Sequence, residues 1–324
     1  MTTTNYKKKF LFFTLLTIFF LFSNYTFAYE IKEASVDIEE NFVLQPGKIE
    51  VEINPGGEAE KTLTVTNRTS KTKLFNIKIS DFSGSDNPSN AVVIHKDGEK
   101  GPYSLKDYIK PELTEFTLKP KEQIIFSVLI SIPKDATPGG LFGTILVSSG
   151  NTLSRDQELQ SGGTNIISEL AALLFVRVSG KAIENGELRD FKIAGGRKYW
   201  FDKSPESFDI LYKNDGNVYL NPYGYIQIKN IFGGDIAKLE VEPYFSLPDS
   251  LRLRKIQWSG SNLFGKYSAT LHLNRGYEDI VDKKTVTFWV IPTMPIVYVF
   301  SGLFIIILVI KLILSKFKIT IKAN

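Results

Sequence analysis

Two apolar segments of different kinds, one near each end, constrain this chain of 324 residues more than any other feature. In the first, the three lysines at 7–9 precede an apolar run at residues 10–22 and a polar stretch that ends at Ala28. Basic residues, a short apolar run and a small residue, in this order, are typical of a secretory signal peptide. We assign residues 1–28 to such a signal.

The second apolar run, residues 294–314, is long enough to cross the ~30 Å hydrocarbon core of a bilayer as one helix. Lys311 interrupts it close to one end, where its aliphatic stem can reach the headgroups. The tail 315–324 contains Lys316, Lys318 and Lys322, and basic flanks favour the cytoplasmic side. The pattern predicts a single-pass protein of the cell membrane, with its ectodomain outside the cytoplasm and a cytoplasmic C-terminus.

The two ends of the chain also account for its positive net charge. Removing the three lysines of the signal and the four from Lys311 onward changes the formal net charge from +4 to −3. The ectodomain therefore gives no reason to expect a nucleic-acid partner. Cysteine is absent, which excludes disulfides and thiolate chemistry. Without disulfides each domain needs its own core, and the length suits two domains of about 100–150 residues, placed at 29–180 and 181–291.

Short segments typical of β-strands, some of them with alternating apolar and polar residues, fill this ectodomain. They lie at 61–67, 74–79, 124–132, 141–147, 208–212, 224–228, 236–241, 267–273 and 285–290. Residues 166–178 fit a buried strand better than a helix, 148–165 have the composition of a loop, and 213–217 (Lys-Asn-Asp-Gly-Asn) predict a hairpin turn. Short strands at this spacing predict an all-β fold of two immunoglobulin-like β-sandwich domains, besides the signal and one transmembrane helix.

No group of residues indicates catalysis or metal binding. The two histidines, His95 and His272, fall in different expected domains. The loop carboxylates Asp81 and Asp86 lack the spacing of a calcium loop. We therefore predict a protein that is not an enzyme and that uses no metal or cofactor.

Aromatic residues offer the only candidates for binding. Tyr199 and Trp200 lie in a loop-like stretch, and Tyr223 and Tyr225 follow a proline. Exposed aromatic side chains are favoured in binding sites and can stack on sugar rings, although sandwich cores use them as well.

Several motifs carry a family resemblance. They are Leu44-Gln-Pro-Gly47, Pro55-Gly-Gly-Glu-Ala-Glu-Lys-Thr-Leu-Thr-Val-Thr-Asn67, Leu118-Lys-Pro-Lys-Glu122 and Ile130-Ser-Ile-Pro-Lys-Asp-Ala-Thr-Pro-Gly-Gly140. Over about residues 40–180 the chain resembles the WxL-interacting surface proteins of bacteria. The resemblance implies a membrane-anchored protein whose first immunoglobulin-like module binds peptidoglycan. The chain has no Trp-x-Leu motif of its own, since none of Trp200, Trp258 and Trp289 is followed by leucine at the second position.

These features together predict a non-catalytic binding or scaffolding protein of the bacterial envelope, with the cell-wall polymer peptidoglycan or other surface proteins as partners. One alternative is a chaperone-like, strand-exchanging assembly factor for surface structures, with 124–132 as its exposed edge strand. A second alternative is a wall-carbohydrate enzyme in which carboxylates such as Asp81 and Glu115 converge.

Overall fold

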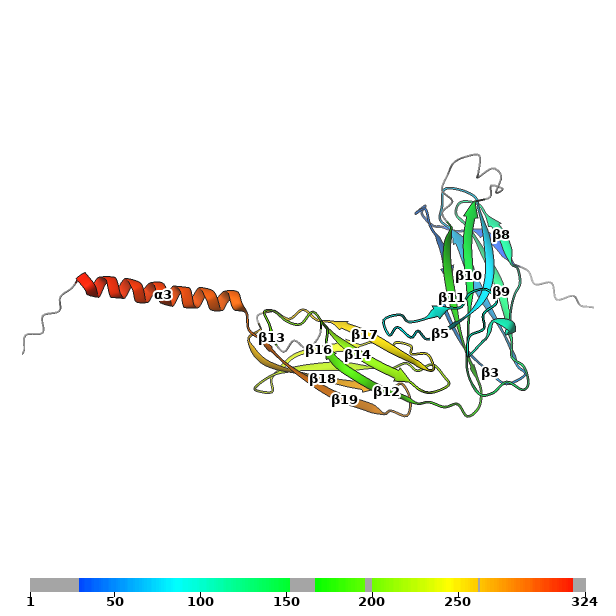
Figure 1. The fold of residues 1–324 in the computed structure, drawn as a ribbon. Coiled ribbons are helices and arrows are strands. Elements are labelled where there is room, and N and C mark those ends of the chain that lie inside the picture. Colours follow the sequence, from blue (N-terminus) through cyan, green and yellow to red (C-terminus); the bar gives the residue numbers. More distant parts are fainter. Residues whose placement is uncertain (1–28, 152–166, 196–199, 262, 317–324) are drawn as a thin grey trace, which may run out of the picture.

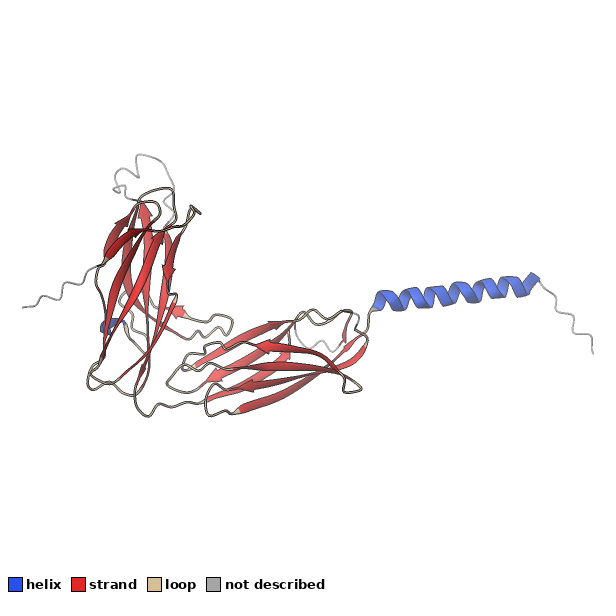
Figure 2. Ribbon diagram, turned by 180° about the vertical axis from the view of Figure 1, so that it is seen from behind, coloured by secondary structure: helices blue, strands red, loops and turns tan. Residues whose placement is uncertain are grey.

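The computed structural model describes residues 29–151, 167–195, 200–261 and 263–316. Over these residues the regular structure is almost entirely β-strand, with a short 3-10 helix, η1 (Lys106–Tyr108), and one long helix, α3 (Thr293–Lys316). Figures 1 and 2 show two β-sandwiches that meet at an angle, followed by α3. The signal assigned to 1–28 lies outside the described residues.

The first sheet of the N-terminal sandwich (residues 30–178) is built around β9 (Glu122–Ser131). On one side β9 pairs with β4 (Glu58–Asn67), which in turn pairs with β2 (Phe42–Gln45). On the other side β9 pairs with β1 (Glu30–Glu33) and β7 (Ile109–Pro111). β9 is therefore a central strand.

This central position shows that the prediction of an exposed edge strand at 124–132 was wrong. Its core-facing residues Ile124, Phe126, Val128 and Ile130 are at most 1% exposed. Alternation of apolar and polar residues reports a strand with one buried face, and it is the same for central and edge strands. The pattern therefore identified the strand without its place in the sheet.

The second sheet of this sandwich has the order β3-β11-β10-β5-β6, with β8 also pairing with β5. Its strands are β3 (Lys48–Ile53), β5 (Lys73–Ser83), β6 (Val93–Ile94), β8 (Glu115–Leu118), β10 (Gly139–Asn151) and β11 (Ser168–Val178). The strand predicted at 166–178 is confirmed over the length of β11. The loop predicted at 148–165 is wrong for residues 148–151, because these extend β10 and pair with β5; residues 152–165 lie outside the described residues.

The two sheets enclose one cluster of buried apolar side chains. β4 and β9 contribute residues such as Leu63 and Phe126, and β10 and β11 contribute Ile145, Leu174 and Val176. Burial of both inner faces is what holds a sandwich without disulfides together.

The C-terminal sandwich (residues 186–290) repeats this plan around a second cluster. One sheet has the order β12-β14-β17 and the other β13-β19-β18-β15-β16. The strands are β12 (Gly186–Ile193), β13 (Trp200–Phe201), β14 (Ser207–Asn214), β15 (Tyr223–Asn230), β16 (Asp235–Val241), β17 (Ser250–Gln257), β18 (Gly265–Asn274) and β19 (Val281–Val290). The hairpin predicted at 213–217 is wrong, because β14 pairs with β12 and β17 while the chain after the turn continues to β15 in the other sheet.

α3 follows β19 after two residues and is the one helix among the described residues that is long and apolar enough to cross a membrane, over Thr293–Ser315. No residue from Thr293 to Ser315 is buried against the rest of the molecule. The span predicted at 294–314 lies within α3. The direction of crossing and the domain limits at 180 and 291 remain predictions.

Candidate functional site

The edge of β11 is covered by a neighbouring strand over only half of its length. On its inner side β11 pairs with β10 from Ser168 to Val178. On its outer side β3 pairs only with Leu173–Val178. Among the described residues, Ser168–Ala172 therefore has no strand partner on its outer side, and we call this segment the β11 free edge.

The gap arises because the chain changes sheets at Pro46-Gly47. Before this point β2 pairs with β4 in the first sheet, and after it β3 pairs with β11 in the second. Proline has no N–H to donate to either ladder. The carbonyl oxygen of Gly47 accepts the first bond of the new pairing, from the N–H of Leu173, at 3.0 Å.

This bond also identifies which backbone groups of the free edge are open. Neighbouring residues in a strand direct their N–H and C=O groups to opposite sides. Since the N–H of Leu173 points toward β3, those of Glu169 and Ala171 point outward on the same side. The C=O of Ala172 points inward, where it accepts a bond from the Oγ1 of Thr144 on β10 at 3.1 Å.

The side chains of the free edge are small or accessible. Ser168 and Glu169 are exposed, Ala171 is half-buried, and Leu170 is 39% exposed. Leu170 belongs to the row of Ala172 and Leu174, which face the core, but it lies where the sandwich ends. An added strand would find backbone groups with which no described strand pairs, and an apolar side chain next to them.

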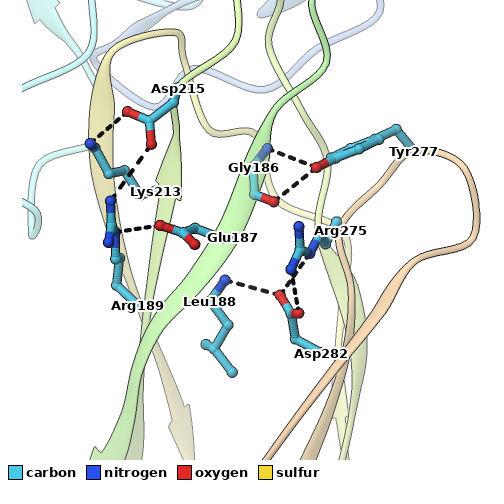
Figure 3. A network of polar contacts seen from close by, with 9 residues as sticks. All are labelled: Gly186, Glu187, Leu188, Arg189, Lys213, Asp215, Arg275, Tyr277 and Asp282. Carbon is cyan, nitrogen blue, oxygen red and sulfur yellow. Dashed lines mark hydrogen bonds and ion pairs between the residues drawn. The ribbon is translucent and has the colours of Figure 1, made fainter.

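Three edge strands of the C-terminal sandwich, β12, β16 and β17, are protected against strand addition. Figure 3 shows that the outer edge of β12 is covered by side chains from the β18–β19 turn. The Tyr277 hydroxyl accepts a bond from the N–H of Gly186 and donates one to its carbonyl oxygen, both at 2.9 Å. Asp282 accepts from the N–H of Leu188 at 3.0 Å and forms a two-bond ion pair with Arg275.

The edges of β16 and β17 are protected in other ways. Charged residues such as Lys238 and Glu240 are exposed along β16, which is a common means of blocking strand addition. On β17, the N–H of Leu253 donates to the carbonyl oxygen of Pro88 in the N-terminal sandwich at 2.8 Å. The β11 free edge combines open backbone groups with an accessible leucine, so we take it as the candidate site.

Removing the carboxylate that closes the β12 edge should destabilise the protein. Asp282→Ala leaves the N–H of Leu188 and the half-buried guanidinium of Arg275 without their acceptor, which we expect to cost about 2 kcal/mol of unfolding free energy. Urea denaturation measures this cost. Asp97→Ala is the control, because it removes an exposed pair with Lys78 and should cost about 0.5 kcal/mol or less. Equal costs for the two variants would contradict this account.

An aromatic cluster joins the two sandwiches. Phe82, Phe142 and Phe175 lie on the outer face of the second sheet, and they pack against residues of the C-terminal sandwich, namely Tyr219, Phe245 and Leu247. Hydrogen bonds add to the contact, from the N–H of Gly140 to the carbonyl oxygen of Asn217 at 2.7 Å and from the Tyr103 hydroxyl to Asp249 at 2.8 Å. The angle between the sandwiches in Figure 1 is therefore fixed by packing at this junction.

The Tyr103–Asp249 contact should depend on pH. Burial, and then the bond that its hydroxyl donates to Asp249, raise the pKa of Tyr103 to about 12, above its ordinary value of 10.0. A raised pKa means that the contribution of the bond is complete below pH 10 and is lost as the pH rises toward 12. We expect inter-sandwich distances, measured between spin labels, to stay constant up to pH 10 and to broaden above it. Tyr103→Phe, which keeps the other tyrosines, should remove this part of the change; an identical pH profile in the variant would contradict it.

The structure separates the aromatic candidates predicted from the sequence. Tyr199 lies outside the described residues. Trp200 pairs with Trp289 at the end of the C-terminal sandwich from which α3 leaves, whereas Tyr223 pairs with Asn274 at the other end. Tyr225 stacks on His272, with ring centroids 4.8 Å apart. These residues form no common surface.

The polar candidates also have structural roles. Asp81 is fully buried and accepts bonds from the N–H groups of Gly101, Leu105 and Lys106 at 2.9–3.1 Å. Glu115 pairs with Asn76, five residues before Asp81 on β5, so the two carboxylates stand about 16 Å apart along the strand and do not converge. His95 and His272 lie in different sandwiches. Within the described ranges no cluster of three or more His, Asp or Glu residues is arranged for a metal ion.

No family model and no curated protein matches the chain. Solved structures similar to it include the class 5 fimbriae chaperone CfaA (12% identity, 78% of this chain and 100% of that chain, TM-score 0.36). Another is the E. coli chaperone DraB, with 14% identity, coverage of 78% of this chain and 98% of that chain, and a TM-score of 0.33. A third is a chain of the Salmonella enterica SafA pilin–SafB chaperone complex, with 12% identity, coverage of 79% of this chain and 100% of that chain, and a TM-score of 0.35. The likeness concerns the immunoglobulin-like β-sandwich fold.

These findings correct the functional expectation of a peptidoglycan-binding scaffold. The aromatic side chains on which wall binding would depend form no single surface, because Trp200 and Tyr223 lie at opposite ends of one sandwich. The Pro-Gly motifs that carried the resemblance are turn chemistry, which many sandwich folds need at the same places. Kinship with the WxL-interacting proteins remains a prediction.

Proposed function

We propose that this protein is a membrane-anchored assembly factor that binds an extended segment of another surface protein along the β11 free edge. The observation that carries the proposal is the open edge itself, where the N–H groups of Glu169 and Ala171 face outward next to Leu170. Addition of a strand to such an edge is a recurring mode of peptide recognition. Main-chain bonds supply affinity, and the side chain of Leu170 supplies an apolar contact.

The partner class follows from the position of the edge. α3 is fit to hold the molecule at a membrane, and the edge belongs to the sandwich farther from α3 along the chain. A segment bound there needs open backbone groups of its own, which an unpaired strand in an incompletely folded protein provides. We therefore propose surface proteins on their way to assembly as the partners.

A photo-crosslinking residue in place of Glu169, in the full chain in the cells that produce it, tests the proposal. We expect a crosslink to one discrete surface protein. Ala171→Pro should abolish it by removing one of the two outward N–H groups, and Ala171→Val is the matched control, because it keeps that N–H and should keep the crosslink. Equal crosslinking by the proline and valine variants would refute strand addition.

Amide hydrogen exchange on the free and the crosslinked protein gives a second readout. In the free protein the amides of Glu169 and Ala171 should exchange fast and those of Leu170 and Ala172 slowly, because only the second pair points toward β10. Binding by strand addition should slow the first pair selectively. Binding through side chains alone would leave the alternation unchanged and would exclude the proposed mode.

A further inference from the structure

The end of the C-terminal sandwich next to α3 exposes an unusual number of large apolar side chains. They are Trp200 (68% exposed), Ile231 (64%), Phe232 (93%), Phe264 (70%) and Trp289 (41%). Large exposed apolar patches on soluble surfaces mark sites of interaction. The five side chains therefore indicate that this end of the sandwich contacts another surface.

Strand register places all five at the same end. β19 runs toward α3, and its last residues Trp289 and Val290 pair with Trp200 and Phe201 of β13. Gly265, directly after Phe264, pairs with Val290. Asn230 pairs with Tyr267, so the β15–β16 turn that contains Ile231 and Phe232 projects from this end as well.

The residues reach this end from distant parts of the sequence. Trp200 precedes the first residue of α3 by 93 positions, and Phe232 precedes it by 61. Only the fold brings them beside the helix, so their position does not follow from closeness in the chain to an apolar segment. Figure 1 shows α3 leaving the sandwich at the end where β13 lies.

A cavity of about 780 Å³ lies at the same place, between the sandwich and the start of α3. Its lining combines polar residues such as Lys203 and Ser259 with the apolar side chains of Leu263, Phe264 and Met294. Lys266, opposite Trp289 in the β-ladder, is exposed nearby. Aromatic rings together with lysines are what the headgroup region of a bilayer favours.

We propose that this end of the C-terminal sandwich docks into the headgroup region of the leaflet that α3 enters, with Trp200, Phe232 and Phe264 inserted among the lipids. We infer that lipid covers the exposed side chains, because only Ile291 and Pro292 separate this end of the sandwich from a helix that is fit to span the membrane. The docked end and the helix together fix the ectodomain to the bilayer at several points. The inference depends on α3 as a membrane span and is independent of the β11 free edge.

Spin labels on the full chain in phospholipid nanodiscs test the proposal, and the natural chain has no cysteine to interfere. A label at Phe232→Cys should be more accessible to oxygen, which concentrates in lipid, than to a water-soluble nickel chelate. Tyr223→Cys is the matched control, because Tyr223 is 43% exposed at the opposite end of the same strand, about 23 Å from Asn230. Its label should favour the nickel chelate.

Two results would overturn the docking. A label at 232 that favours the nickel chelate as much as the one at 223 places the turn in water. A label at 232 that is shielded from both reagents places it against protein, such as a second copy of the chain.

The native tryptophans give an independent test that leaves Phe232 unchanged. Trp258 is 8% exposed in the core, whereas Trp200 is exposed at the docking end. In nanodiscs with brominated acyl chains, the emission of Trp289→Phe should be quenched through Trp200. The double variant Trp200→Phe/Trp289→Phe, which retains only Trp258, should show little quenching. Equal quenching of the two variants would contradict insertion of Trp200.

Discussion

Replacing Phe175 by alanine is expected to lower the free energy of unfolding by about 3–5 kcal/mol and to loosen the angle between the two sandwiches. Phe175 is fully buried, and its ring lies 5.0 Å from that of Tyr219 and 5.2 Å from those of Phe82 and Phe245. The substitution would leave a cavity bounded by side chains of both sandwiches. The cost therefore includes lost contacts across the junction.

Urea denaturation measures the first effect, and distances between spin labels at Glu60→Cys and Lys283→Cys measure the second. Both positions are exposed, one in each sandwich. Phe126→Ala is the control, because Phe126 is 1% exposed within the N-terminal core and away from the junction cluster. It should cost a similar free energy without broadening the distances. Equal broadening by the two variants would show that the junction is not held by the aromatic cluster.

Proline is expected to have opposite consequences at two neighbouring positions of β11. Ala172→Pro removes an inward N–H of the β10–β11 ladder, in a fully buried part of the sheet, and should cost about 3 kcal/mol of unfolding free energy. Ala171→Pro removes an outward N–H that has no strand partner, and edge positions of this kind tolerate proline. We expect it to cost less than about 1 kcal/mol.

Thermal or urea unfolding of the two variants is the measurement, and it is also the folding control for the crosslinking experiment. The contrast depends on the direction of each amide and not on residue size, since both substitutions replace alanine. Severe destabilisation by Ala171→Pro would mean that its amide is bonded in the protein, and the β11 free edge would then not exist as described.

The sequence predicted the strands well because their cause is local. β-branched residues in alternation and turn residues between them specify extended segments. The two sandwiches also share a local feature, an asparagine at the end of a strand. Asn67 and Asn214 are both fully buried, and each bonds to backbone groups of the following turn.

The place of each strand within its sheet was not predictable from such patterns. β9 has a strongly β-like sequence and lies at the centre, whereas the candidate edge belongs to β11, whose sequence was ambiguous between helix and strand. The break at Pro46-Gly47 was a visible signal, since it ends one strand and begins another. Which neighbour each of the two strands would take is a long-range property of the fold.

The angle at the aromatic junction determines how a captured segment would lie relative to the bilayer. Figure 1 shows the strands of the N-terminal sandwich running across the axis of α3. A segment paired with β11 must follow its direction, and so would lie flat above the lipid surface. Its height would be set by the C-terminal sandwich, whose ten-residue strand β19 spans about 33 Å. If α3 spans the membrane as proposed, the search for partners would be two-dimensional, within one layer above the bilayer.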